Sequence, residues 1–386
     1  MPFVINFLDG GFFFISAYRF AKAGCPALVC GSGVTCWGLV YCIVSMFLGK
    51  IVNTGNALKF IISGGTILSL SSAGFMVFDA LFLQFLWLGL AGVGAALFCT
   101  PFQLFAKSLE SSENSVKPDT ARATAFYTAS WSIGLASGPL VFARLPYKTG
   151  FLITLCLAVG VTLLLGVVAF LLKNNRAKSD NIEGEEKQSG YSTEYISAKS
   201  RLAVLGWIIG VTGTFAVSIV RALWPKHADL LEISRDHAAY ILALVSYSQA
   251  VTAILFCKSK RWMYSKSAAV WMGLVGILPL LGFAFGEGML AFYFSAAAFG
   301  VYTGSIYFYL VFHSLDHPEK PQYFVAGNEV LVGLTCIIAP LAGGITVDCS
   351  GLSGSGFVLS AGVVLVTMVV QLAVLKRLAL EKQGII

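Results

Sequence analysis

Charged residues are scarce in this 386-residue sequence, and that scarcity excludes an ordinary soluble domain. Asp, Glu, Lys and Arg together make up 12% of the chain, whereas hydrophobic residues make up 57%. The mean hydropathy is +0.80. A soluble domain of this length carries polar faces throughout. The composition therefore predicts an all-α integral membrane protein.

Motifs typical of ATPases, disulfide-rich proteins and metalloproteins are missing as well. No Gly-x-x-x-x-Gly-Lys-Ser/Thr run occurs, so no phosphate-binding loop for ATP is expected. The nine cysteines form no Cys-x-x-Cys pair and are interpreted as small buried hydrophobic residues. No Asn-x-Ser/Thr sequon occurs, which favours a bacterial inner membrane over a glycosylated cell surface. No metal and no cofactor is predicted, because the histidines lack zinc-like spacing: His227, His237, His313 and His317.

One long polar run, residues 173–201, divides the chain into two halves with six hydrophobic segments each. Its mixed charges and lack of large apolar residues predict a flexible linker. The expected domains are a six-helix bundle at 1–172 and a second one, with a short tail, at 202–386. A membrane helix needs about 20 residues, and the expected helices are 3–20, 28–49, 60–78, 82–104, 122–144, 149–172, 202–222, 238–257, 267–286, 289–312, 323–346 and 355–375.

Loops and basic residues give the expected topology. Most loops are short, apart from an expected stretch at 225–237, so consecutive helices should pack antiparallel. Most of the 26 Lys and Arg residues fall on the side of the polar run, which places both termini and the linker in the cytoplasm. Segment 3–20 is interpreted as an uncleaved first helix, because no basic region precedes it and Asp9 interrupts the apolar run.

Two expected helices, 122–144 and 323–346, share features that indicate an internal repeat. Aligning Pro139 with Pro340 also sets Leu140 against Leu341. The same alignment sets Tyr127 against Asn328. Parallel repeats of this kind occur in secondary transporters, with the binding site between the halves.

With twelve helices and a central cytoplasmic loop, these glycine–proline runs resemble the major facilitator superfamily over essentially the whole chain. The resemblance implies two pseudo-symmetric six-helix bundles that move a small solute by alternating access, often with coupling to a proton or another ion. The residues that carry the resemblance, and that we expect to serve conformational change, are Gly134, Gly138 and Pro139, with Pro340, Gly343 and Gly344.

The family's signature loop, Gly-x-x-x-Asp-Arg-x-Gly-Arg-Arg, is only partly kept. Gly49 is present, but Asn53 stands at the Asp position, Thr54 at the Arg position and Asn56 at the second Gly, with Lys59 nearby. The charged latch that the resemblance implies for this loop is therefore expected to be largely absent.

Two carboxyl groups are expected at membrane depth, where an ionisable group costs at least about 2.5–3.5 kcal/mol at the helix centre. Asp9 lies about 10 Å from the cytoplasmic edge of its helix, and Glu329 lies at comparable depth beside Asn328. Either group is a candidate for proton binding or substrate contact. The structural alternative is that Asp9 caps a helix near the headgroups and that Glu329 bonds to a neighbouring helix.

Three arginines, Arg19, Arg144 and Arg221, are expected to end helices at the outer surface. Extension of their side chains to the headgroups explains each one. Recognition of an anionic substrate is the alternative, and Arg221 is the preferred candidate.

Polar and aromatic side chains within the expected helices form a further candidate set. Apolar pockets with a few convergent polar groups suit small organic ligands, whereas the structural alternative is hydrogen bonding between helices, worth about 0.6 kcal/mol per pair. The set comprises Tyr127, Thr128, Ser130, Trp131, Tyr247, Gln249, Tyr302, Tyr307 and Asn328.

We therefore expect a multi-pass secondary transporter of a small solute, with the proton as a candidate coupling ion. The alternative is a transport-inactive membrane sensor or assembly factor. An enzyme is not expected, because no His, Asp and Ser cluster lies near one interface. The expected partners are a small-molecule substrate and the lipid bilayer. We expect a monomer and, because the basic residues are scattered over short loops, no nucleic acid.

Overall fold

The computed structural model describes residues 2–53, 55–112, 120–176, 193–317 and 321–380, and these residues form twelve long helices without strands. A short 3₁₀ turn, Arg261–Tyr264, precedes the ninth helix. The long helices are α1 (Pro2–Lys22), α2 (Ala27–Ile51), α3 (Ala57–Val77), α4 (Leu83–Ser112), α5 (Thr120–Arg144), α6 (Tyr147–Arg176), α7 (Thr193–Leu230), α8 (Arg235–Phe256), α9 (Lys266–Phe285), α10 (Met289–Leu315), α11 (Pro321–Ser350) and α12 (Ser355–Leu380).

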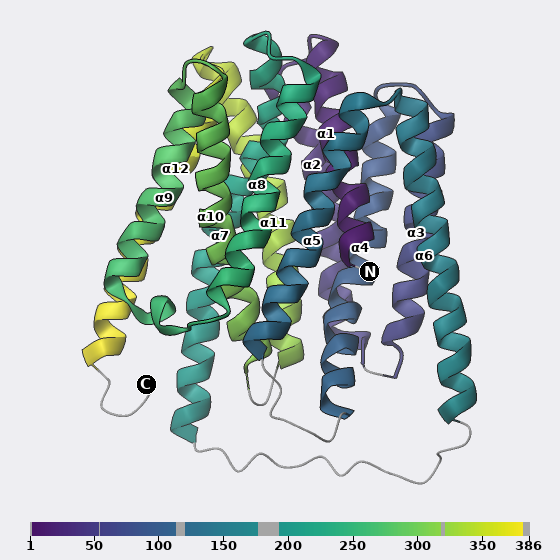
Figure 1. Ribbon diagram of the computed structural model, residues 1–386, viewed down its shortest axis with the longest axis vertical. Coiled ribbons are helices and arrows are strands. Elements are labelled where there is room, and N and C mark those ends of the chain that lie inside the picture. Colours follow the sequence, from purple (N-terminus) through teal and green to yellow (C-terminus); the bar gives the residue numbers. More distant parts are fainter. Residues whose placement is uncertain (1, 54, 113–119, 177–192, 318–320, 381–386) are drawn as a thin grey trace.

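The helices run up and down and form two bundles, α1–α6 and α7–α12, which lie side by side in Figure 1. Short connections make consecutive helices antiparallel. The bundles meet where α2 packs along α11 and α5 packs along α8. We call the face where α6 ends and α7 begins the linker face. The opposite face, with Lys22, Arg144 and Leu230, is the distal face.

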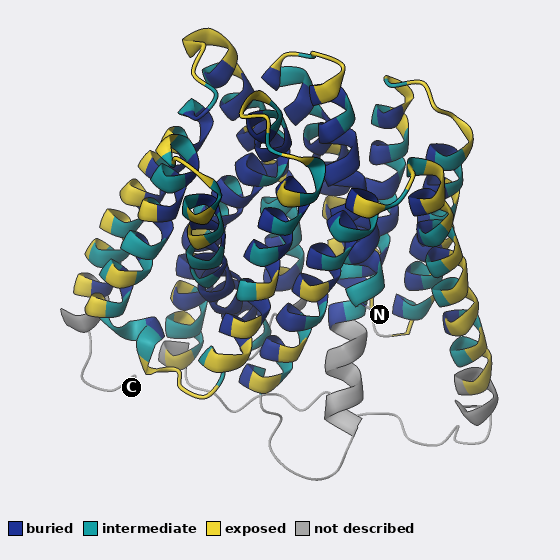
Figure 2. Ribbon diagram, turned by 45° about the horizontal axis from the view of Figure 1, so that its top comes forward, coloured by how far each residue is buried: buried dark blue, intermediate teal, exposed yellow. Residues whose placement is uncertain are grey.

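Burial follows the two-bundle arrangement. Buried residues fill the centre, whereas exposed residues follow the outer helices and the loops (Figure 2). Phe170, Trp271 and Phe294 are large apolar side chains with exposed fractions of 65%, 64% and 74%, as expected for a surface that contacts lipid. Ten of the described helices are long and apolar enough to cross a membrane by themselves, and α1 and α5 are not among them. Both α1 and α5 pack against helices of the two bundles, so they need less apolar surface.

The twelve expected helices are all present, but three expected boundaries are wrong. Helix α4 extends to Ser112 instead of 104, and α7 begins at Thr193 instead of 202, so residues 193–201 of the expected linker are helical.

The third boundary is the end of α7. The stretch 225–237 is not a loop, because α7 continues through Pro225 to Leu230. Pro225 removes one backbone hydrogen bond. Packing compensates for this loss, since the buried Trp224 donates its indole N–H to the Ala238 carbonyl oxygen at 3.0 Å. Arg221 consequently lies more than two turns before the end of α7 and does not end the helix as expected.

The expected linker is bordered by helix on both sides. Helix α6 continues to Arg176 and α7 begins at Thr193. Residues 177–192 lie outside the described part of the chain.

Glycines allow α5 and α11 to approach their neighbours closely. A Cβ at Gly134 or Gly138 of α5 would overlap the α1 backbone at Phe3 or Phe7. In α11, a Cβ at Gly344 would lie 2.6 Å from the Leu28 Cα of α2. Small residues allow this backbone proximity between membrane helices. The two glycine–proline helices therefore pack by the same principle.

Replacing Gly138 with Ala should force α5 away from α1, because the new methyl group has backbone atoms as neighbours. The expected cost is about 1–3 kcal/mol of unfolding free energy, measured as a lower melting temperature in detergent. Gly166→Ala on α6 is the matched control, since a Cβ there meets nothing within 4 Å. Equal melting temperatures for the two variants would contradict the assignment of Gly138 to close packing.

Candidate functional site

A cavity of about 110 Å³ lies between the two bundles. At roughly 10–15 Å³ for each water-sized sphere, it has room for about nine such spheres. Helices α1, α2, α4 and α5 of the first bundle and α7, α10 and α11 of the second contribute to its wall. The lining residues are Asn6, Asp9, Phe13, Trp37, Tyr41, Cys99, Tyr127, Trp131, Leu135, Thr214, Ser218, Arg221, Tyr307, Leu310, Val311, Asn328, Glu329, Val332 and Cys336.

Helix α1 presents a carboxyl group to this cavity. Asn6, Asp9 and Phe13 all line it, and their spacing places them on one helix face. The Asp9 side chain is 4% exposed, and its Oδ1 has no hydrogen-bond partner among the described residues. The Trp37 indole of α2 lies beside the carboxyl group. One acceptor of Asp9 is therefore left open at the cavity wall.

Helix α7 presents a guanidinium group from the opposite bundle. Thr214, Ser218 and Arg221 follow one another at helical spacing and line the cavity. One terminal nitrogen of Arg221 is buried without a hydrogen-bond partner among the described residues. Arg221 acts electrostatically on Asp9, yet these two described residues form no ion pair. An acid and a base from opposite bundles thus share one cavity without contact.

Glu329 of α11 joins the two bundles directly. The Tyr41 hydroxyl group of α2 donates a hydrogen bond to its Oε2. The Gln103 amide of α4 donates to its Oε1 at 2.6 Å. Both donors belong to the first bundle and the acceptor to the second, so this carboxyl group crosslinks them. Hydrogen bonds to an ionised acceptor are stronger than neutral ones.

Asn328, the neighbour of Glu329, ties α11 to its own bundle. Its Oδ1 accepts from the Trp207 indole N–H of α7 at 2.7 Å and from the Ser314 hydroxyl group of α10 at 3.0 Å. These bonds fix the register of α11 on α7 and α10. The position of Glu329 between the bundles is thereby fixed as well.

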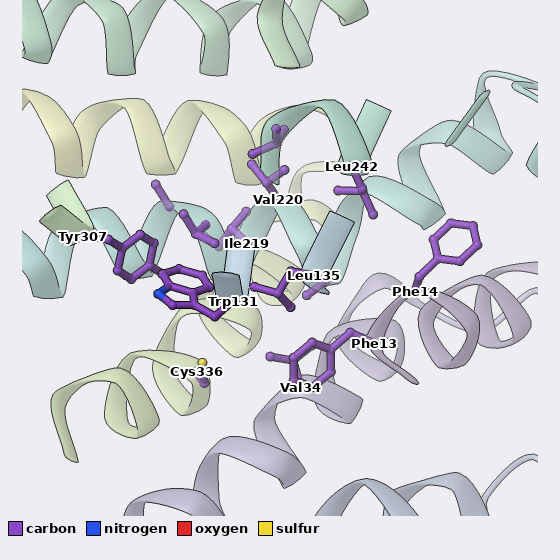
Figure 3. Packing of buried hydrophobic residues seen from close by; sticks show 14 of the residues in the cluster. Phe13, Phe14, Val34, Trp131, Leu135, Ile219, Val220, Leu242, Tyr307 and Cys336 are labelled. Carbon is purple, nitrogen blue, oxygen red and sulfur yellow. The ribbon is translucent and has the colours of Figure 1, made fainter. Parts of the chain in front are cut away.

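Aromatic rings form the apolar part of the cavity wall. Trp131 of α5 meets Tyr307 of α10 edge to face, with ring centroids 4.8 Å apart, and Figure 3 shows the two rings beside Leu135. On the other side, Trp37 lies between Phe13, at 5.3 Å, and Tyr41, at 4.4 Å. Edge-to-face and offset pairs of this kind add stability beyond simple burial.

The structure places seven of the predicted site residues around the cavity and the others elsewhere. Tyr247 is 37% exposed and lies 3.3 Å from the Ser137 hydroxyl oxygen. Gln249 donates to the Ser132 hydroxyl group at 2.6 Å. These two residues hold α8 to α5, whereas Tyr302 packs on Gly276 of α9. The seven at the cavity are Asp9, Tyr127, Trp131, Arg221, Tyr307, Asn328 and Glu329.

Several cavity residues were not predicted from the sequence. The available signal was a polar stripe at spacings of three and four on an apolar helix, as in Thr214, Ser218 and Arg221 or in Asn6 and Asp9. Tyr41 and Gln103, which donate to Glu329, could not be found from such a stripe, because they lie on two other helices. The residues missed are Asn6, Trp37, Tyr41, Cys99, Gln103, Thr214 and Ser218.

The loop between α2 and α3 is closed by asparagine side chains. The Asn53 Oδ1 accepts from the backbone N–H groups of Gly55 and Asn56, both at 3.0 Å. The Asn56 Oδ1 accepts from the Asn53 N–H at 2.7 Å, and its Nδ2 donates to the Ile51 carbonyl oxygen at 2.8 Å. Neutral side chains therefore shape this turn. Thr54 lies outside the described residues.

Polar contacts join the bundles at the distal face. Lys22 of α1 forms an ion pair with Asp229 of α7 at 2.6 Å. The Asp348 carboxylate of α11 accepts from the first two backbone N–H groups of α2, those of Ala27 and Leu28, both at 2.9 Å. A carboxylate at a helix N-terminus compensates unpaired N–H groups and the helix dipole. Here the compensating group comes from the other bundle.

The two predicted arginines at this face also make specific contacts. Arg144, the last residue of α5, donates to the Tyr240 hydroxyl group of α8. Arg19 forms an ion pair with Asp79 at 2.8 Å. Tyr147 lies 5.5 Å from the guanidinium groups of both Arg19 and Arg235, which come from different bundles. The distal ends of the bundles are thus held together by charged and aromatic side chains.

Comparison with known proteins gives one family and one fold. The family model of the Major Facilitator Superfamily matches residues 3–324. A mutant of the nucleoside transporter NupG is similar in structure, with a TM-score of 0.67, 12% identity, and 96% of this chain and 97% of that chain covered. The human organic anion transporter MFSD10 (TETRAN) has a TM-score of 0.62, 14% identity, and 96% and 94% covered. None of the curated proteins matches the sequence.

Replacing Glu329 with Ala should lower the free energy of unfolding by about 1–3 kcal/mol, because the Tyr41 hydroxyl group and the Gln103 amide then lose a buried acceptor. Glu329→Gln keeps one carbonyl oxygen and should cost less. Melting temperatures in detergent compare the two variants with the wild type. A wild-type melting temperature for Glu329→Ala would show that these hydrogen bonds do not hold the bundles together.

Proposed function

This chain belongs to the Major Facilitator Superfamily and is a membrane transporter, and from that premise we propose that it carries a small organic solute by alternating access. The observation that carries the proposal is the cavity in which Asp9 and Arg221, from opposite bundles, face each other without pairing. Polar groups without partners in a mostly apolar cavity are suited to bind a ligand. The names of both similar structures, a nucleoside transporter and an organic anion transporter, support an organic solute and disfavour the sensor alternative.

The polar contacts of the distal face support a state that is closed on that side. The Lys22–Asp229 ion pair and the Asp348 contacts with α2 cross between the bundles. The surplus of Lys and Arg at the linker face supports a cytoplasmic position for that face. In this proposal the distal contacts break when the bundles rock and the cavity opens outward. The Glu329 crosslink, on the cytoplasmic side of the cavity, then holds the bundles together.

Replacing Asp348 with Ala should shift the protein toward the outward-open state, because the first turn of α2 loses its compensating carboxylate. A helix cap is worth about 1 kcal/mol, or about fivefold in the equilibrium. Electron-spin distance measurements between labels at Ala23→Cys and Glu232→Cys, in a background with the nine native cysteines replaced, report the opening. Both positions are exposed at the distal face and belong to different bundles.

The control for this experiment is Asp79→Ala, because Asp79 pairs with Arg19 within one bundle. That variant should keep the wild-type distance distribution. An unchanged distribution in Asp348→Ala would contradict a role for Asp348 in distal closure.

Asp9 is the group that we assign to proton coupling. A buried carboxylate charge is costly unless it is paired, and a proton removes that charge. Glu329 differs, since two hydrogen-bond donors stabilise its carboxylate. A proton on Asp9 leaves the charge of Arg221 without compensation, which links proton binding to the contents of the cavity. The titratable groups around the cavity are Arg221 on α7, Cys99 on α4, Cys336 and Glu329 on α11, Tyr41 on α2, Tyr127 on α5 and Tyr307 on α10.

Replacing Asp9 with Asn should abolish solute accumulation driven by a pH gradient and leave exchange of solute intact. Proteoliposomes incubated with a mixture of metabolites, with and without an imposed pH gradient, provide the test. Retained solutes are identified by mass spectrometry. Glu287→Gln is the matched control, because this exposed carboxyl group lies in the loop between α9 and α10.

Each outcome of this experiment tests a different part of the proposal. Accumulation that follows the gradient in the wild type but not in Asp9→Asn supports coupling through Asp9. Accumulation without any gradient dependence retains the transporter and removes proton coupling. No flux of any solute through well-folded protein would contradict transport itself.

A further inference from the structure

The charges of the central cavity specify the class of its ligand. Arg221 is the only cation among the described residues that line it. We propose that the ligand is a small organic monoanion, a carboxylate with an aromatic or branched apolar body, whose carboxylate binds Arg221. This inference rests on the proposed function, since it names the substrate of the same cavity.

The guanidinium group of Arg221 favours an anionic ligand. One terminal nitrogen is buried and has no hydrogen-bond partner among the described residues. A buried guanidinium nitrogen without a partner is costly, and the planar donors of the group fit the two oxygens of a carboxylate. Thr214 and Ser218 lie on the same face of α7. A ligand carboxylate at Arg221 is therefore within reach of hydroxyl groups as well.

The two carboxyl groups of the cavity leave Arg221 available to a ligand. Glu329 already accepts from Tyr41 and Gln103, so it is engaged in joining the bundles. Asp9 lies near enough to act electrostatically on Arg221 but forms no ion pair with it. With the coupled proton on Asp9, Arg221 loses the negative charge that acts on it from α1, and the carboxylate of an anionic ligand takes the place of that charge. Proton and anion then occupy the cavity together.

The walls of the cavity determine the body of the ligand. Arg221 also lines a small adjoining cavity of about 20 Å³, where its neighbours include Phe13, Leu135 and Val217. On the cytoplasmic side lie the paired rings of Trp131 and Tyr307. The cavity volume of about 110 Å³ favours a small ligand. Flat or branched apolar groups fit such walls.

A zwitterion is the competing ligand class. Its ammonium group would meet Asp9 and its carboxylate Arg221. That arrangement requires an ionised Asp9, so the ligand and the coupled proton would exclude each other. The two classes therefore differ in how binding responds to neutralisation of Asp9.

Matched probes test the proposal by isothermal titration calorimetry on purified wild-type protein. Four carboxylates are used, namely phenylacetate, indole-3-acetate, benzoate and 4-methylpentanoate, each with its neutral amide, and phenylalanine is the zwitterion. We expect at least one carboxylate to bind at least about tenfold more tightly than its amide and than phenylalanine. Equal binding of acid and amide, preference for phenylalanine, or no binding by any carboxylate would overturn the proposal.

Variants locate the binding and its charge requirement. Arg221→Gln should weaken carboxylate binding about 10- to 100-fold, and Arg221→Lys should retain part of it. Asp9→Asn imitates the protonated group, so binding should persist and should not show the decrease with rising pH that we expect for the wild type. Size-exclusion profiles establish that each variant is folded. Unchanged binding in folded Arg221→Gln, or loss of binding in folded Asp9→Asn, would contradict the assignment.

The test distinguishes this inference from the proposed function. If no carboxylate binds but other solutes accumulate in proteoliposomes, the substrate class is wrong and the transporter remains. If carboxylates bind at Arg221 but no solute accumulates, the site is correct and transport is contradicted.

Discussion

The contact between α2 and α11 is the interaction on which the two-bundle structure depends. At the distal face, Asp348 accepts from the first N–H groups of α2. In the middle, Glu329 accepts from Tyr41, and near the linker face Gly49 meets Ala326, where a Cβ would lie 3.0 Å from the alanine Cβ. A single helix pair thus carries a charged contact, a buried hydrogen bond and close packing at successive depths. Movement between the bundles must act on all three.

The polar groups of the two bundles divide into those that meet and those that remain apart. Glu329 meets its donors, so its carboxyl group serves the association of the bundles. Asp9 and Arg221 remain apart, so their free energy of desolvation can be recovered only by a proton or a ligand. The free energy of binding a proton or a ligand is therefore gained at the centre of the cavity. At the linker face of the first bundle, the turn between α2 and α3 is held by the neutral side chains of Asn53 and Asn56.

Helix number and the two-bundle arrangement could be predicted from the sequence, because each depends on local hydrophobicity and its spacing along the chain. The continuation of α7 past Pro225 could not, since the packing of Trp224 against α8 decides it. For the same reason Arg221 was expected at a helix end, although the structure places it at the cavity. Gln249 and Tyr302 had the composition of cavity residues, yet their neighbours are other helices. Contacts between residues of distant segments produce no sequence pattern within a single helix.

The carboxylate of Asp348 also has a consequence for the electrical behaviour of the molecule. The positive end of the α2 dipole is compensated by a charge that belongs to the other bundle. Separating the bundles at this face exposes both to water, where dissolved ions screen them over about 8–10 Å. Ionic strength on the distal side therefore lowers the free energy of the open state. In the proposed alternating-access cycle, the salt content of that compartment is then a determinant of how often the cavity opens toward it.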